Sequence, residues 1–169
     1  MYKGTTIKIY TGATFSEQTR IRGHKETLIQ LGHTVLSTWL EEQLRPEGMS
    51  EAQFGHKMAI KDLQEVNACD CFILDTQSPS KTAGKMIEYG FAVAKHKLIY
   101  VVGEQPKHAI FLSLADKAFA TWDELFAYFK ATHKTEKSFS EQLGSTYLLE
   151  LPKETKATPH YGVFGKPGV

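Results

Sequence analysis

A carboxylate near the start of an apolar helix is the feature of this sequence best suited to chemistry. The segment Ser80–Ala92 follows an apolar strand, Cys71–Asp75, and opens a helix with Glu88 about one turn inside it. In an open α/β sheet, ligands usually bind in the cleft above the carboxyl ends of the strands. The helix dipole favours the ionised form of a carboxyl group near the N-terminus of the helix. We therefore predict that Glu88 is a nucleophile or a base.

Asp62 is a second carboxylate that the sequence directs toward the protein interior. It falls on the apolar stripe of an expected helix, Glu51–Ala68, which carries Met58, Leu63 and Val66 on the same face. A carboxylate on an inward stripe needs a partner or a function. We treat Asp62 as a candidate site residue, although a local ion pair or cap would also explain it.

Loops that follow neighbouring parallel strands converge on the same edge of a sheet. At that edge the sequence adds Tyr10, Gly12, Trp39, Asp75 and the segment 78–84 to the candidates. Each has a simpler explanation: Tyr10 as a core aromatic, Trp39 as a wall of the core, Asp75 as a turn residue at a strand end, and Gly12 as a turn glycine. The sequence leaves both explanations open.

The segment Ser80–Met86 has only a superficial likeness to a phosphate-binding P-loop. The first glycine of that motif is absent, and Met86 stands where the motif has Ser or Thr. No GxGxxG follows the first strand, where the run is Gly12–Ser16. These departures argue against a nucleoside-triphosphate or dinucleotide site of either kind. Lys81 and Lys85 could simply be solvent-facing charges.

Strands alternate with helices along the chain. Strands are expected at 6–10, 34–38, 71–75, 98–102 and 117–119, and helices at 16–31, 51–68, from the early eighties to about 95, 107–114, and 121 to about 130. Alternation of this kind indicates βαβ units and a parallel sheet. We predict a three-layer flavodoxin-like or Rossmann-like α/β domain with a five-stranded, mainly parallel sheet. It should span residues 1–131, with 132–169 as a C-terminal extension that ends in a tail from Lys153.

Bulk properties narrow the classes of partner. The chain has 169 residues and a net charge of +1, which favours neither a nucleic-acid duplex nor an anionic membrane. Its first residues lack the apolar stretch of a signal peptide, and no run is long enough to span a bilayer. Cys69 and Cys71 have no metal or redox spacing, and the histidines form no metal motif. We expect buried thiols, a cytoplasmic location, no metal and no cofactor.

Taken in order, four segments resemble the nucleoside 2-deoxyribosyltransferase superfamily, which includes nucleoside 5'-monophosphate N-glycosidases. They are IYTGATF at Ile9–Phe15, the segment from Asp62 through the strand ending at Asp75, GKMIEYGFA at Gly84–Ala92, and ATWDEL at Ala120–Leu125. The third resembles the family's GxxxExGxA nucleophile helix. The likeness covers roughly residues 5–130.

The resemblance implies roles for individual residues. Glu88 would attack C1' of the sugar, and Asp62 and Tyr10 would hold sugar hydroxyls or orient Glu88. Phe15 and Trp39 would stack on the base. Substrate contacts are also expected from Gly12, Asp75, Ser80, Thr82, Gly84 and Lys85.

The turn before the Glu88 helix departs from the family pattern, because Lys85 stands where a Thr or a small residue is usual. Lys81 and Lys85, with Ser80 and Thr82 at a helix N-terminus, suggest a 5'-phosphate. The resemblance also implies a homodimer or larger homo-oligomer. Two alternatives remain: a nucleotide-binding module without turnover, and a TIR-like enzyme that cleaves NAD. The sequence does not distinguish hydrolysis from transfer.

Overall fold

A parallel five-stranded sheet forms the centre of the protein. The computed structural model describes residues 6–41, 44–78, 83–104 and 110–142, and the side chains of these residues as far as 132. The strands are β1 (Lys8–Gly12), β2 (Thr34–Val35), β3 (Cys71–Asp75), β4 (Leu98–Val102) and β5 (Lys117–Phe119). Their order is β2-β1-β3-β4-β5, and every neighbouring pair is parallel. This is the flavodoxin-like order of a doubly wound sheet, so the predicted fold class is confirmed.

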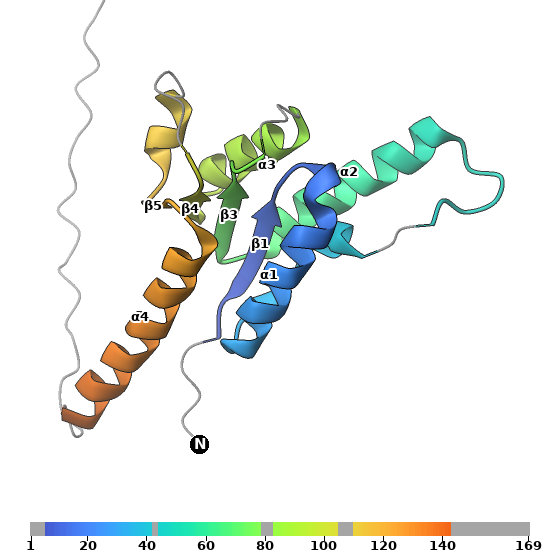
Figure 1. Ribbon diagram of the computed structural model, residues 1–169. Coiled ribbons are helices and arrows are strands. Elements are labelled where there is room, and N and C mark those ends of the chain that lie inside the picture. The colour runs from blue at the N-terminus through green and yellow to red at the C-terminus, as the bar shows by residue number, and fades with distance from the viewer. Residues whose placement is uncertain (1–5, 42–43, 79–82, 105–109, 143–169) are drawn as a thin grey trace, which may run out of the picture.

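Within the described residues, four α-helices cover the two faces of the sheet. They are α1 (Gln18–Gln30), α2 (Glu51–Ala68), α3 (Ala83–Ala94) and α4 (Trp122–Gln142). Helices α1 and α4 lie on one face, and α2 and α3 lie side by side on the other (Figure 1). Short 3₁₀ turns lie between these elements at η1 (Phe15–Glu17), η2 (Thr38–Leu40) and η3 (Ile110–Leu114).

The core forms around β3 and β4 because their sequences are almost continuously apolar. Every residue of β3 is buried, as are the last four of β4. Strands buried on both faces show such runs rather than alternation. Helix α2 begins with a capping box, in which Ser50 accepts from the Gln53 amide and the Gln53 side chain accepts from the Ser50 amide. This was expected from the spacing of the two residues.

Several boundaries differ from the sequence predictions, and the segment expected as a helix at 107–114 is a 3₁₀ turn where the structure describes it, from Ile110. Strand β1 continues through Gly12, which was expected to end it, because Gly12 pairs with Leu74 of β3. Strand β2 is only two residues long, since η2 begins where further strand was expected. Helix α4 runs past Lys130 to Gln142 because no glycine or proline interrupts it. The division into domains at 131 stays a prediction, and the expected tail from Lys153 lies outside the described residues.

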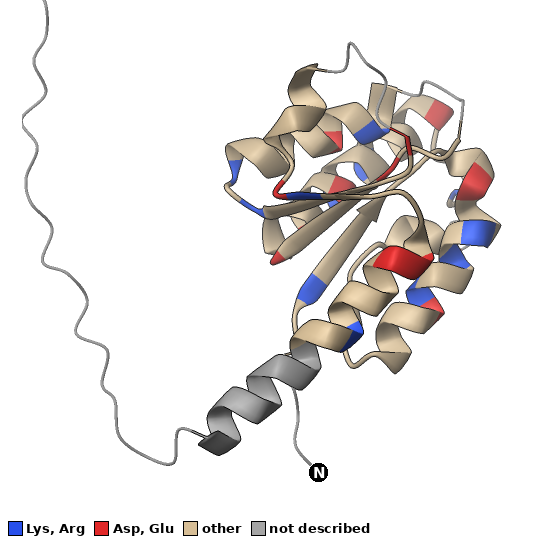
Figure 2. Ribbon diagram, turned by 60° about the vertical axis from the view of Figure 1, so that its left-hand side comes forward, with Lys and Arg blue, Asp and Glu red and all other residues tan. Residues whose placement is uncertain are grey.

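Positively and negatively charged residues both occur on the helices that the structure describes. Figure 2 shows positions of Lys and Arg interspersed with those of Asp and Glu, in keeping with the net charge of +1. Cys69 and Cys71 are free and buried, as expected. None of the helices within the described ranges combines the length and the hydropathy needed to cross a membrane.

Candidate active site

The face of the sheet covered by α2 and α3 contains a hydrogen bond between two of the candidate residues. The hydroxyl of Tyr10, in β1, donates to Oε1 of Glu88, in α3, at 3.1 Å. The Tyr10 ring is fully buried and stacks on Phe72 of β3, with ring centroids 5.7 Å apart. Because the ring is fixed by packing, its hydroxyl is a preorganised donor that orients the carboxylate.

Gly12 allows Glu88 to approach the end of β1 closely. A Cβ at position 12 would lie 3.1 Å from Oε2 of Glu88 and 2.7 Å from the ring of Phe72. Any side chain there would displace the carboxylate or the ring. Gly12 is therefore required by close packing around Glu88, whereas a Cβ at Gly84 would have no atom within 4 Å.

Asp62 brings a second carboxylate to this cluster from α2. Its Oδ1 is buried and accepts no hydrogen bond from any residue that the structure describes. Burial, followed by the nearby negative charge of Glu65, raises the pKa of Asp62 to about 6, while Lys61 acts in the opposite direction. Asp62 thus resists ionisation, as a carboxyl group in a poorly solvated, acidic environment should.

Glu88 is held in its protonated form over an unusually wide pH range. Burial raises its pKa to about 8, with further increases from Asp62 and Glu65, while the hydrogen bond from Tyr10 lowers it. The pKa of Tyr10 is itself raised by burial and by the charge of Glu88, so its hydroxyl stays a donor. Two interacting carboxyl groups with separate pKa values are the arrangement by which enzymes obtain an acid and a base at the same pH.

Glu65 belongs to the same cluster, although it was not predicted as a site residue from the sequence. It lies three positions after Asp62 on α2, and its carboxylate accepts hydrogen bonds from both the amide and the hydroxyl of Thr38. The spacing of three was a signal that the two acids share a helix face. The contact with Thr38 spans 27 residues and depends on tertiary structure.

The two aromatic residues expected to stack on a base differ in exposure. Phe15, in the turn after β1, is 72% exposed. Trp39 is buried in η2, and its indole nitrogen donates to the carbonyl of Thr11 at 2.8 Å. Phe15 is therefore available as a platform, whereas Trp39 forms a fixed wall.

Asp75 is engaged in structural contacts. It accepts two hydrogen bonds from the guanidinium of Arg20, at 2.9 and 3.0 Å, and one from the indole of Trp122 at 2.7 Å. The amide of Gln77 donates to it at 3.1 Å. Both carboxylate oxygens are used in tying α1 and α4 to the end of β3. We leave Asp75 out of the site that we propose.

Lys85 is also less accessible than the sequence suggested. It is buried in the first turn of α3, and its Nζ donates to the carbonyl of Asp75 at 3.2 Å. Burial lowers its pKa, whereas Asp75 and Glu17 raise it. The idea of a solvent-facing charge is wrong for Lys85. Ser80 and Thr82, and Lys81 with them, lie outside the described residues.

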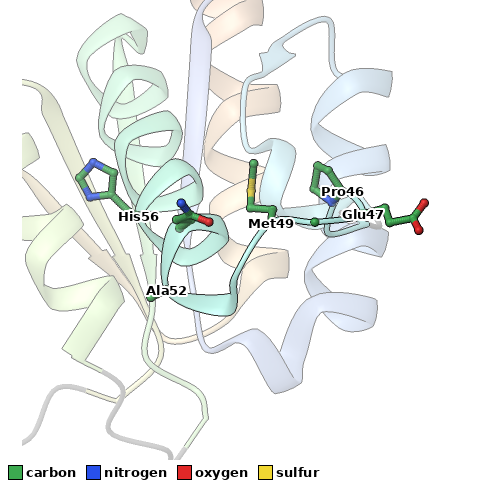
Figure 3. A pocket seen from close by; sticks show the side chains of 7 residues that line it. Pro46, Glu47, Met49, Ala52 and His56 are labelled. Atoms are coloured by element: carbon green, nitrogen blue, oxygen red, sulfur yellow. The ribbon is translucent and has the colours of Figure 1, made fainter.

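A surface hollow of about 710 Å³ lies at the start of α2 (Figure 3). It is lined by Pro46, Glu47, Gly48, Met49, Ala52, Gln53 and His56. None of these residues belongs to the acidic cluster that Asp62, Glu65 and Glu88 form. Within the part of the chain that the structure describes, no group of three His, Cys, Asp or Glu residues is arranged to hold a metal ion.

The model of the nucleoside 2-deoxyribosyltransferase family matches residues 10–143. The chain belongs to this family. The match contains Tyr10, Asp62, Glu65 and Glu88, so the acidic cluster lies wholly within the matched residues. Membership supports nucleoside deoxyribosyl transfer or cleavage of an N-glycosidic bond as the activity. A comparison with curated proteins found no significant sequence match.

Solved structures of low sequence identity share the fold of this nucleoside 2-deoxyribosyltransferase family member. A 2-deoxyribosyltransferase from Bacillus psychrosaccharolyticus is 18% identical, with a TM-score of 0.62 over 75% of this chain and 95% of its own. A CMP N-glycosidase from Clostridium botulinum is 20% identical, with a TM-score of 0.50 over 73% and 98%. A conserved protein from Enterococcus faecalis is 14% identical, with a TM-score of 0.58 over 76% and 99%. At these identities the likeness concerns the fold.

Proposed function

We propose that this protein cleaves the N-glycosidic bond of a nucleoside or nucleoside 5'-monophosphate, with Glu88 as the nucleophile. The observation that carries the proposal is the hydrogen bond from the buried Tyr10 to Glu88, beside a second carboxyl group at Asp62. A fixed carboxylate is suited to the oxocarbenium-like transition state of glycosidic cleavage. Orientation by Tyr10 supplies the alignment that nucleophilic attack requires.

The proposed reaction begins with attack of a Glu88 carboxylate oxygen on C1' of the sugar. The C1'–N bond breaks, its electron pair stays on the base, and a C1'–O ester bond forms with Glu88. Glu88 and Asp62 interact and share one proton near neutral pH, so attack by the Glu88 carboxylate requires that this proton reside on Asp62. We propose that Asp62 then supplies it to the departing base. Water or a second base then attacks C1', which releases Glu88 and gives hydrolysis or transfer respectively.

Two features bear on substrate recognition. Phe15 offers an exposed ring at the end of β1, and base–aromatic stacking contributes about 1–3 kcal/mol per base. We propose that Ser80 and Thr82 bind a 5'-phosphate at the start of α3, since helix N-termini attract anions. Lys85, which is buried and donates to the Asp75 carbonyl, would contribute positive charge to this site. Gly84, also in this turn, is proposed as a close backbone contact.

We further propose that the protein acts as a homodimer or larger homo-oligomer in the cytoplasm. Exposed apolar side chains lie on α3 and on η3, namely Met86, Ile87, Ile110, Phe111 and Leu114. The two elements are joined by a hydrogen bond from the Tyr89 hydroxyl to the Phe111 carbonyl at 2.6 Å. Clustered apolar surface favours association. Light scattering at several protein concentrations would test this assembly, and a monomer at all of them would contradict it.

The test of the proposed activity is a chromatographic assay for free base. The protein would be incubated with nucleosides and their 5'-monophosphates, with and without a second base, beside Glu88→Ala. We expect the wild-type protein to release base, and the rate of release to be lower by roughly 10³-fold or more in the variant. A new nucleoside in the presence of the second base identifies a transferase. Binding without turnover would indicate a nucleotide-binding module, and turnover of NAD alone a TIR-like enzyme.

A further inference from the structure

Glu65 connects the acidic cluster to the turn that follows β2. Its two carboxylate oxygens accept from the amide of Thr38, at 3.0 Å, and from the Thr38 hydroxyl. Thr38 is the first residue of η2, which carries the buried Trp39. The carboxylate is therefore held in one orientation by two donors on a single residue.

The turn η2 has further attachments that do not involve Glu65. Gln18 of α1 donates to the carbonyl of Trp39 at 2.7 Å, and Arg22 donates to the carbonyl of Leu40 at 2.9 Å. The Trp39 indole binds the carbonyl of Thr11. Because α1 and β1 hold the turn independently, removal of the Glu65 charge should leave η2 in place.

Glu65 forms no ion pair with any residue that the structure describes. The ion pairs among those residues are Arg20–Glu17, Arg20–Asp75 and Lys25–Glu41. Its hydrogen bonds come from neutral groups. One turn away lies Asp62, whose buried Oδ1 accepts no hydrogen bond within the described structure. The charged or titratable groups around the cluster are Tyr10 from β1, Lys61, Asp62 and Glu65 from α2, and Glu88 from α3.

Like charges in a poorly solvated region cannot all ionise near neutral pH, and the group with the best hydrogen bonds keeps its charge most easily. Glu65 accepts two hydrogen bonds, Glu88 accepts one from Tyr10, and Asp62 Oδ1 accepts none. Glu65 therefore has the most hydrogen-bond donors of the three carboxyl groups, and its charge raises the pKa values of both Asp62 and Glu88. The proton is then left to Asp62 and Glu88.

We propose that Glu65 is a positioning residue whose fixed negative charge keeps one proton on the Asp62–Glu88 pair at neutral pH. The catalytic use of that proton rests on the proposed function, in which one member of the pair attacks C1' and the other protonates the base. The placement of the charge itself does not depend on the reaction.

The experiment compares Glu65→Gln with Thr38→Val, by ¹³C NMR titration of the side-chain carboxyl carbons without substrate. Glu65→Gln removes the charge and keeps a hydrogen-bond acceptor for the Thr38 amide. Thr38→Val keeps the charge and removes the hydroxyl donor. We expect Glu65→Gln to move the titration of the Asp62–Glu88 pair to lower pH by about one unit. Thr38→Val should move it by less than half as much.

No shift in Glu65→Gln, or a shift in Thr38→Val at least half as large, would overturn the proposal. Glu65→Asp keeps the charge and is a further check. In this variant the titration of the Asp62–Glu88 pair should differ from that of the wild-type protein by less than half of the shift seen in Glu65→Gln. If any nucleoside of the panel is turned over, both limbs of the pH–rate profile of Glu65→Gln should lie at lower pH than those of the wild-type protein. If it is not, the proposed function fails while the NMR titration still decides the role of Glu65.

Discussion

The Tyr10 hydroxyl and the Glu88 carboxylate are separated by 78 positions in the sequence and by 3.1 Å in the structure. One residue lies in a central strand and the other in the helix that follows the next strand of the sheet. The ring of Tyr10 is buried between sheet and helices, so the donor has little freedom. A preorganised donor costs no reorganisation during a reaction.

Tyr10→Phe should lower the rate of base release by roughly 10- to 100-fold and leave the fold intact. The phenyl ring can keep the stack on Phe72, whereas the hydrogen bond to Glu88 is lost. Because that bond lowers the pKa of Glu88, its removal should raise this pKa and move the acid limb of the pH–rate profile to higher pH. Steady-state rates across pH measure both effects.

Tyr89→Phe is the matched control for this prediction. It removes a tyrosine hydroxyl from the same helix as Glu88, but that hydroxyl binds the carbonyl of Phe111 in η3. The acid limb of the pH–rate profile of Tyr89→Phe should lie at the same pH as that of the wild-type protein. An equal displacement of the limb in both variants would contradict the assignment of Tyr10.

Gly12→Ala should impair both stability and activity. The added methyl group would lie 2.7 Å from the Phe72 ring and 3.1 Å from Oε2 of Glu88. Overpacking of this kind costs about 1–3 kcal/mol, and displacement of the carboxylate should reduce base release at least about 10-fold. Thermal unfolding and the base-release assay are the measurements.

Gly23→Ala provides a control for the glycine substitution. Gly23 is exposed in α1, and a Cβ there would have no atom within 4 Å. The change should be neutral or should stabilise the protein by up to about 1 kcal/mol through helix propensity. If both alanine variants behave alike, close packing around Gly12 is not the reason for the glycine.

Asp75→Asn should destabilise the protein by about 2 kcal/mol, since it removes the buried charge that faces Arg20. Arg20 is about one-third exposed, at 32%, so solvent reduces the cost below that of a fully buried pair. Denaturant unfolding measures the loss. Activity per folded molecule should be retained, and a large increase in KM without loss of stability would return Asp75 to the substrate-binding residues.

Glu88→Gln should stabilise the protein increasingly as pH rises from about 4.5 to about 8. The pKa of Glu88 is raised from 4.5 to about 8 on folding, mainly by burial, so the folded state binds the proton more tightly than the unfolded state. Stability of the wild type therefore falls as pH rises through this window. The variant has no charge to bury.

The expected gain for Glu88→Gln is about 1–3 kcal/mol at pH 9, and it should vanish near pH 4. Melting temperatures of the two proteins across this range supply the comparison. A constant difference at every pH would show that Glu88 is not held in a destabilised ionised state.

Sequence patterns were sufficient for the layered architecture and for the central residues of the candidate site. The apolar runs of Cys71–Asp75 and Leu98–Val102 specify buried parallel strands, because only such strands are covered on both faces. Glu88 and Asp62 were found because a carboxylate among apolar helix positions is unusual. Strand ends were predicted less well, since Gly12 continues its strand through a pairing with Leu74.

The sequence by itself determined the order of strands and helices, because local hydrophobic periodicity encodes it. It indicated Asp62 and Glu88 by their places on apolar helices, and Tyr10 by its place at a strand end and by the resemblance to the family. Only the tertiary structure decided how the remaining polar groups are used. Asp75 pairs with Arg20, and Glu65 binds Thr38, through contacts between residues distant in sequence. A pattern of residue types indicates which side chains are buried. The partner that each buried polar group finds depends on the packing of whole elements against one another.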